Sequence, residues 1–323
     1  MPTWLVVVAT SLVMAVLVVA SVMIGAIDVS VADLVAGDDD AWDVLLLSRV
    51  PRTTAILLAG SAMAVAGLVM QMLVRNRFVE PSTVGTTEAA GLGLLLVTIL
   101  APAMPLPGKI GVAAAFALAG TLLFLAVLRA VPVRSIVTVP LLGMMLAGVI
   151  GAVATWIAYR YDLLQTLGAW MTGDFSGIVA GRMELLWVTA ALAVVAYVMA
   201  DRFTVAGLGK DTATALGLPY GVVMALGLGL VAVVSAVVVV VVGGLPFLGL
   251  VVPNVASLLV GDNLRRTLPW VAVGGAGLVL LCDVLGRVLR YPYEIPIGVV
   301  MGVVGSLVFL YLLLRAPAGR SGA

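Results

Sequence analysis

Long apolar runs, separated by short polar or charged stretches, follow one another along almost the whole chain. A helix needs about 20 residues to cross a bilayer, so these runs predict ten transmembrane helices. We place them at residues 4–27, 53–74, 86–103, 110–131, 137–158, 184–200, 220–242, 246–260, 269–289 and 296–314. The runs are continuous rather than alternating, which disfavours a transmembrane β-barrel. The pattern predicts an all-α polytopic membrane protein with one transmembrane domain, residues 1–323.

Two of the predicted helices are atypical. The run at 246–260 contains Pro253 and is only about 15 residues long, so we expect it to be broken or to cross only in part. The first run, residues 5–27, is too long for the apolar part of a signal peptide and has no basic segment before it. We therefore interpret it as the first transmembrane helix.

The charges in the loops favour one orientation. With the N-terminus inside, the inner loops carry ten basic residues and the outer loops seven, and the acidic run Asp38–Asp39–Asp40 lies outside. Cytoplasmic loops carry the excess of Lys and Arg in membrane proteins. The bias is small, and it favours a cytoplasmic N-terminus.

The composition supports the membrane assignment and excludes several functions. The chain is 63% hydrophobic and 10% charged, whereas soluble domains carry about 25% charged residues. It has no histidine and one cysteine, Cys282, so we expect no disulfide within the chain and no histidine-based metal, haem or proton-relay site. The net charge of +1 gives no indication of nucleic-acid binding.

Ionisable side chains are rare in the middle of the predicted helices. Glu88 and Asp283 lie near helix ends, and the polar residues Gln71 and Asn254 lie deeper. Ion-coupled transporters normally need buried carboxylates or histidines, so the pattern disfavours secondary transport. The stretch 207–211 resembles a phosphate loop only faintly, because Asp stands where Ser or Thr would hold magnesium. We expect no catalytic residue and no nucleotide site in this chain.

One polar stretch, residues 201–219, interrupts the apolar pattern. It can form a short amphipathic helix with an apolar face (Ala206, Leu208, Ala213, Leu216) opposite a polar face (Lys210, Asp211, Thr214). Gly217 and Pro219 would end this helix. A helix of this kind between two transmembrane helices is suited to docking a soluble partner. The alternatives are a helix lying flat on the lipid headgroups and a plain linker.

Five stretches resemble motifs of one transporter family. They are Ser48–Arg52 (SRVPR), Gly67–Gly85 (GLVMQMLVRNRFVEPSTVG), Gly173–Gly177 (GDFSG), Gly243–Pro269 (GGLPFLGLVVPNVASLLVGDNLRRTLP) and Glu294–Gly298 (EIPIG). In this order they resemble the FecCD-type permeases of ABC importers, which carry iron–siderophore complexes, haem or cobalamin. The resemblance spans nearly the whole chain, and the 27-residue block at 243–269 is its most specific part.

The chain departs from the family pattern at several positions. Arg77 stands in place of the proline after Asn76, Asn254 and Asn263 in place of two histidines, and Ser257 in place of an arginine. This variant, with YPYE at 291–294, resembles a subgroup of permeases for ferric siderophores, often of the catecholate type. Haem and cobalamin are the alternative cargoes.

The resemblance implies a type II ABC importer permease with about ten transmembrane helices per subunit. Two permease subunits, identical or paralogous, would enclose one path, above a cytoplasmic ATPase dimer that holds ATP and Mg²⁺. An extracytoplasmic binding protein would deliver the ferric siderophore. This chain would bind no cofactor, would not be an enzyme, and would lie in the bacterial inner (cytoplasmic) membrane in contact with lipid.

The resemblance also gives roles to particular residues. Residues 201–219 would form the cytoplasmic coupling-helix segment, with the ATPase-coupling residues Val205, Leu208, Lys210, Asp211, Thr214 and Leu216. Three arginines would dock the binding protein, because a guanidinium pairs well with carboxylates: Arg49, Arg52 and Arg287. The gate and path would include Asn76, Arg77, Glu80, Pro81 and Asn254.

Several of these roles have structural alternatives. The arginines could contact lipid phosphate, and Arg77 could anchor in the headgroups. Asn254 could cap the helix break at Pro253 rather than touch cargo. For the whole chain, the rival classes are an ion-coupled secondary transporter and a membrane scaffold without transport activity.

Overall fold

The computed structural model describes residues 3–25, 36–131, 138–181, 183–261 and 263–315. Every regular element in this part of the chain is helical. The main helices are α1 (Thr3–Met23), α4 (Val50–Val74), α5 (Thr86–Leu100), α6 (Leu106–Ala130), α7 (Thr138–Arg160), α9 (Trp187–Val198), α12 (Tyr220–Val241), α13 (Leu248–Val260), α14 (Leu264–Val288) and α15 (Ile297–Arg315). The shorter elements are α3 (Asp39–Val44), the π-helical η1 (Leu45–Arg49), the 3-10 turns η2 (Ser82–Val84) and η3 (Glu184–Leu186), α8 (Leu164–Met171), α10 (Ala200–Gly207) and α11 (Lys210–Ala215).

Each of the ten predicted runs overlaps one of the main helices, which confirms the all-α polytopic fold. Among the described residues, six helices are long and apolar enough to cross a membrane, and α9 with α10 forms a further candidate that is bent by 63°. The helices α5, α13 and α15 are apolar but shorter. The run at 246–260 forms one short helix, α13, whose 13 residues continue through Pro253 without a break.

The central helix is α4, which packs against α9, α12, α13 and α14. Most of its 25 residues are buried. Small residues let neighbouring backbones approach it closely. A Cβ on Gly60 would lie 2.9 Å from the carbonyl oxygen of Gly275 in α14, and a Cβ on Gly67 would lie 2.2 Å from the Cα of Gly249 in α13. These glycines fix where α13 and α14 cross α4.

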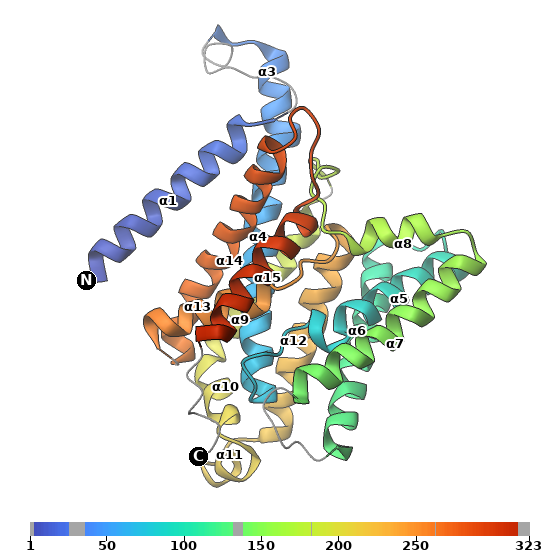
Figure 1. Cartoon of the computed structure of the whole chain (residues 1–323), viewed down its shortest axis with the longest axis vertical. Coiled ribbons are helices and arrows are strands. Elements are labelled where there is room, and N and C mark those ends of the chain that lie inside the picture. Colours follow the sequence, from blue (N-terminus) through green and yellow to red (C-terminus); the bar gives the residue numbers. More distant parts are fainter. Residues whose placement is uncertain (1–2, 26–35, 132–137, 182, 262, 316–323) are drawn as a thin grey trace.

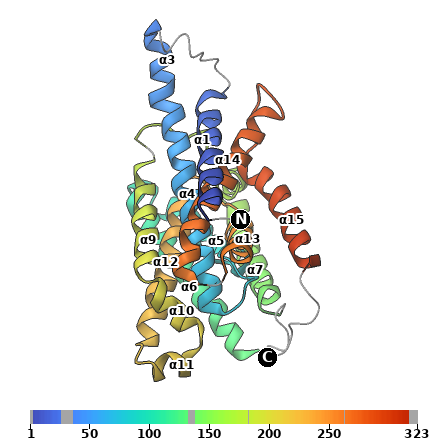
Figure 2. The ribbon, with the colours of Figure 1, turned by 90° about the vertical axis from the view of Figure 1, so that its left-hand side faces the viewer.

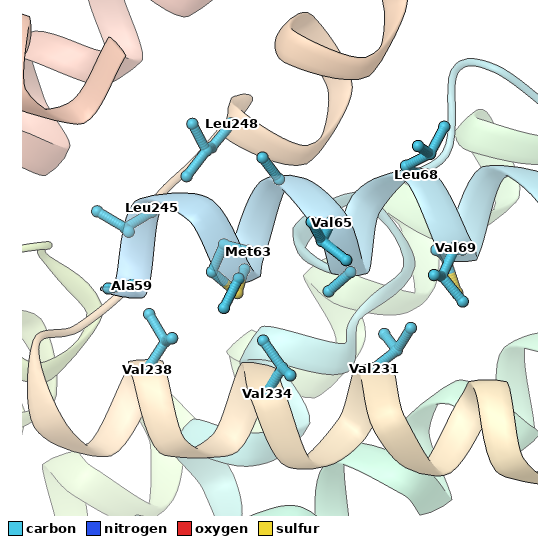
Figure 3. Packing of buried hydrophobic residues seen from close by; sticks show 14 of the residues in the cluster. Ala59, Met63, Val65, Leu68, Val69, Val231, Val234, Val238, Leu245 and Leu248 are labelled. Atoms are coloured by element: carbon cyan, nitrogen blue, oxygen red, sulfur yellow. The ribbon is translucent and has the colours of Figure 1, made fainter. Parts of the chain in front are cut away.

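The two parts of the bundle meet at α12. This helix contacts α4 and α9 as well as α5 and α6, and Figure 1 shows α5, α6, α7 and α8 grouped on the side of the molecule away from α14. Val231, Val234 and Val238 lie on one face of α12 and point toward α4 (Figure 3). Ala232 and Ala236 pack in a second cluster with alanines of α5 and α6. The 3.6-residue periodicity of α12 thus places these three valines against α4, and Ala232 and Ala236, with Val239, against α5 and α6.

The molecule is elongated, with α3 at one end and α10 and α11 at the other (Figures 1 and 2). We call these the α3 end and the α11 end. From α3 through η1 to α4 the chain forms one 36-residue helical stretch, Asp39–Val74, which at 1.5 Å per residue is about 54 Å long. The hydrocarbon core of a bilayer is about 30 Å thick, so the stretch extends beyond it.

Candidate functional site

The predicted coupling segment lies at the α11 end, where it forms two short helices. Leu208 and Gly209 join α10 to α11. Gly209 has a φ of 110°, a conformation that favours glycine. A Cβ on Gly209 would lie 2.7 Å from Nη1 of Arg75, the residue that ends α4. The elbow between α10 and α11 therefore needs glycine and rests against the end of the central helix.

Most of the predicted coupling residues are exposed. Val205 is half-buried, and the exposed ones are Leu208, Lys210, Asp211, Thr214 and Leu216. Of the predicted apolar face, Ala206 and Ala213 are buried, whereas Leu208 and Leu216 are 57% and 65% exposed. Of this face, the alanines and not the leucines pack against the protein, and Phe203, which is fully buried, also anchors the segment. Exposed leucines beside charged residues form a surface suited to a protein partner.

The connection from α4 to α5, residues 75–85, is largely packed into the protein. Asn76 is 4% exposed, and its Oδ1 accepts a hydrogen bond from the N–H of Phe78 at 2.8 Å, which closes a local turn. Pro81 is also buried, whereas Arg77 is exposed. Asn76 and Pro81, both predicted gate residues, therefore shape the connection in this conformation.

Glu80 holds the start of α13. Its side chain is buried, with the residue 2% exposed. Oε1 accepts hydrogen bonds from the N–H of Phe247 at 2.9 Å and from the hydroxyl of Ser82 at 2.6 Å. The first N–H groups of a helix lack partners within it and carry positive partial charge, so a buried carboxylate is stabilised there.

A side chain from α4 replaces the helical hydrogen bond that Pro253 removes from α13. Pro253 has no N–H to donate to the carbonyl of Gly249, four residues earlier. Nε2 of Gln71 donates to that carbonyl at 3.0 Å instead. Nδ2 of Asn254 donates to a carbonyl within α13 at 2.6 Å and to the carbonyl of Arg77 at 2.8 Å. Gln71 thus satisfies the carbonyl that the proline leaves, and Asn254 links α13 to the connection.

A cavity of about 300 Å³ lies where these elements meet the coupling segment. It brings together three predicted gate residues and one predicted coupling residue: Asn76, Arg77, Asn254 and Leu208. Gln71 and Arg75 also line it, whereas Glu80 and Pro81 do not. The predicted gate and the predicted coupling segment, far apart in sequence, therefore share one space at the α11 end.

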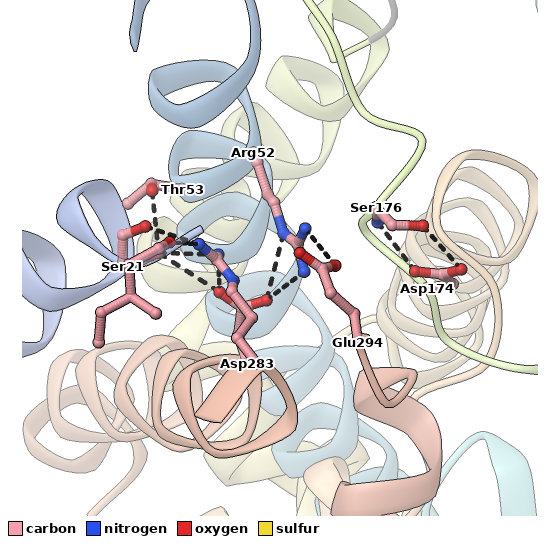
Figure 4. A network of polar contacts seen from close by, with 9 residues as sticks. Ser21, Arg52, Thr53, Asp174, Ser176, Asp283 and Glu294 are labelled. Carbon is pink, nitrogen blue, oxygen red and sulfur yellow. Dashed lines mark hydrogen bonds and ion pairs between the residues drawn. The ribbon is translucent and has the colours of Figure 1, made fainter. Parts of the chain in front are cut away.

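A network of buried charges lies at the α3 end (Figure 4). Arg52 donates to Oδ1 of Asp283 through Nη2 at 2.8 Å and Nε at 3.2 Å, and to Oε2 of Glu294 through Nη1 at 2.7 Å. Arg287 pairs with the other carboxylate oxygen of Asp283. The side chain of Asp283 is 0% exposed and that of Arg52 11% exposed. The network ties α4 to α14 and to the segment before α15.

The other two predicted docking arginines hold the end of α1. Arg49 and Arg287 are 5% and 4% exposed. Their guanidinium groups donate four hydrogen bonds, 2.6–2.9 Å long, to the carbonyls of residues 21–24. The last carbonyls of a helix lack partners within it, and cations are favoured there. Arg49 and Arg287 therefore cap α1.

The docking role predicted for these three arginines would require their internal contacts to open. In this conformation all three bind groups of the same chain. Arg290 lies at the same end and is exposed, with its guanidinium carbon 5.7 Å from the centre of the Tyr293 ring. Arg290 is thus an exposed cation at the α3 end, beside the buried network, in the part of the chain that the structure describes.

Two carboxylates are more deeply buried than the sequence suggests. Glu80 and Asp283 are 2% and 1% exposed, although Asp283 was expected near a helix end and Glu80 in a loop. Each is bound to groups of the protein: Glu80 to the start of α13, and Asp283 to two arginines. Their burial therefore has a structural explanation and does not require a coupling ion.

Three of the motif stretches meet at a junction of glycines. The N–H of Gly298 donates to the carbonyl of Gly173 at 2.8 Å. A Cβ on Gly173 would lie 2.5 Å from the carbonyl oxygen of Gly244. These motif glycines mark places where backbones touch, which only glycine permits.

Comparison with known proteins agrees with these features. The sequence pattern of the FecCD transport family matches residues 13–315. The chain is 45% identical over 304 residues to the petrobactin import system permease protein of Bacillus subtilis (strain 168), covering 94% of this chain and 96% of that one. It is 43% identical to the petrobactin import system permease protein of Bacillus anthracis, covering 88% and 86%. It is 40% identical to the ferric-anguibactin transport system permease protein of Vibrio anguillarum, covering 91% and 94%.

A solved structure has the same fold. It is an inward-facing transporter described as of the metal-chelate ABC type, with a TM-score of 0.81 and 24% identity, covering 96% of this chain and 99% of that chain. The apolar helices, together with the family match and the permease relatives, define a multi-pass membrane permease. The chain belongs to the FecCD transport family, which confirms the family that the five motifs indicate.

Proposed function

We propose that this chain is the membrane permease subunit of a binding-protein-dependent ABC importer that carries a ferric siderophore into the cytoplasm. The observation that carries the proposal is the exposed surface of α10 and α11. It joins Leu208 and Leu216 to Lys210 and Asp211, and its elbow borders the cavity lined by the predicted gate. A partner that binds this surface can act on the gate directly.

The relatives support the choice of cargo. The three relatives described above are named for petrobactin and ferric anguibactin, at 40–45% identity. The relative named for iron(3+)-hydroxamate import is 29% identical, and the relatives named for vitamin B12 import are 32–34% identical. A ferric siderophore is therefore favoured over cobalamin and haem.

The proposal includes partners. A cytoplasmic ATPase dimer would hold ATP and Mg²⁺ and bind α10 and α11, and this chain would have no enzymatic activity of its own. A second permease subunit, identical or paralogous, would complete the path. A binding protein outside the cytoplasmic membrane of a bacterium would deliver the ferric siderophore to the α3 end.

Association with the ATPase tests the proposal. Deletion of residues 207–216, or Lys210→Glu combined with Asp211→Lys, should abolish co-purification of the ATPase and siderophore uptake. Asp40→Lys is a matched control, because Asp40 is exposed at the α3 end and should leave association unchanged. Normal association of the ATPase with the deletion variant would contradict the proposed docking surface.

A further inference from the structure

Three polar contacts join α13 to the end of α4 and to the connection that follows it. Glu80 accepts a hydrogen bond from the N–H of Phe247, the residue before α13. Gln71 donates to the carbonyl of Gly249, and Asn254 donates to the backbone of the connection after α4. The contacts run from residue 247 to residue 254, so the first half of this short helix is bound by one neighbouring segment.

Two backbone features reinforce these contacts. Phe247, the residue before α13, has a φ of 63°, a conformation that is rare and costly for a bulky residue and persists only where the surroundings fix it. The hydrogen bond from its N–H to Glu80 is one such restraint. The close approach of Gly67 and Gly249 is another, because no side chain separates the two backbones.

We propose that α13 and residues 71–85 move as one body during transport, with Glu80 as the positioning residue that joins them. This inference rests on the proposed function and deepens it. The gate is then not a loop that opens by itself: when α10 and α11 are displaced, residues 71–85 carry α13 with them. The displacement reaches residues 71–85 through Arg75, because this side chain lies against the elbow at Gly209.

The position of Glu80 explains why it can join the two segments. Its carboxyl group accepts a hydrogen bond from the N–H of Phe247 at 2.9 Å, directly before α13, and another from Ser82 within the connection. A substitution that removes the carboxyl group leaves the part-buried N–H of Phe247 without this partner. The start of α13 is then free to shift relative to the connection.

Distances between spin labels test the common motion. Cys282 is the only cysteine, so Cys282→Ala provides a background for labels at the exposed positions Arg77 and Leu258. In the full complex with its ATPase, this distance should be the same without nucleotide and with ATP. A second pair, at Leu258 and the exposed Leu141 of α7, an element outside this body, should change its distance. A change in the first pair as large as that in the second would overturn the proposal.

Coupling between ATP hydrolysis and uptake tests the role of Glu80. Glu80→Ala should lower ferric siderophore uptake per ATP hydrolysed roughly tenfold and broaden the distance distribution of the Arg77–Leu258 pair. Glu80→Gln keeps an acceptor oxygen and should restore part of the loss. Glu184→Ala is the matched control, since Glu184 also accepts a backbone N–H, that of Gly181, but is exposed and lies outside the proposed body, so coupling should be unchanged.

The outcomes of these experiments distinguish a failure of this inference from a failure of the proposed function. If the wild-type complex takes up no ferric siderophore, the proposed cargo is wrong, and the spin-label distances still test the common motion. If the wild type transports and Glu80→Ala couples ATP hydrolysis to uptake as well as wild type, the positioning role is wrong. If the Glu80 variants fail to fold, the label distances in the otherwise unaltered complex decide.

Discussion

The side-chain amide of Gln71 donates to the carbonyl of Gly249 at 3.0 Å across the α4–α13 contact. That carbonyl lacks its usual helical partner because residue 253 is proline. The contact joins residues 178 positions apart in the sequence. It satisfies the one carbonyl that the proline leaves without a donor inside α13, near the predicted gate.

Gln71→Leu should destabilise the protein by about 1–3 kcal/mol, because a buried carbonyl loses its donor. The melting temperature of the purified protein in detergent measures this loss. Gln71→Glu should be at least as harmful, since a carboxylate cannot donate to the carbonyl unless it is protonated. A Gln71→Leu variant as stable as wild type would show that the bond contributes nothing.

Gly67→Ala should be among the most damaging single-methyl additions. The new Cβ would lie 2.2 Å from the Cα of Gly249, so the two helices must separate, at a cost of about 1–3 kcal/mol or more. Gly229→Ala is the matched control, because a Cβ on Gly229, in the middle of α12, would meet no atom of a neighbouring element within 4 Å. That substitution should be neutral or stabilising by up to ~1 kcal/mol. Equal melting temperatures for the two variants would contradict the packing described for α4.

Asp283→Asn should destabilise the protein much more than Glu294→Gln. Asp283 is fully buried between Arg52 and Arg287, and removing one member of a buried ion pair costs about 3–5 kcal/mol. The side chain of Glu294 is 26% exposed, so its loss should cost no more than ~1 kcal/mol. Thermal denaturation of the two variants compares them, and the reverse order would refute the network as described.

Arg287→Ala and Arg290→Ala should separate stability from docking. Arg287 is buried against α1 and Asp283, so its alanine variant should lower the melting temperature. Arg290 is exposed, so Arg290→Ala should leave the melting temperature unchanged and weaken the stimulation of ATP hydrolysis by the binding protein. If Arg287→Ala reduces that stimulation and Arg290→Ala does not, and both variants keep their fold, then Arg287 rather than Arg290 docks the binding protein.

The sequence predicts the helices well because lipid requires long apolar stretches, and ten such runs can be read directly. The sequence also shows where backbones come into close contact, since each such contact requires a glycine at that position of a motif. It does not reveal what Arg49 does, because the carbonyls that bind this arginine belong to α1, and nothing local marks them as its partners.

The predicted site residues show the same limit. Glu80 and Asn254 stand out as polar residues in apolar surroundings, which suggests importance but not role. Their roles emerge only when α13 lies against residues 71–85. Gln71 could have been found by asking which donor satisfies the carbonyl four residues before Pro253, but the sequence alone does not say which helix supplies it.

ATP-dependent uptake into proteoliposomes tests the central claim most directly. Vesicles should contain the chain with its permease partner, ATPase and binding protein, and radiolabelled ferric siderophore should be supplied outside. We expect accumulation only with ATP and Mg²⁺ on the ATPase side, and none when residues 207–216 are deleted. Accumulation against a gradient by the chain alone, with no nucleotide present, would contradict the account.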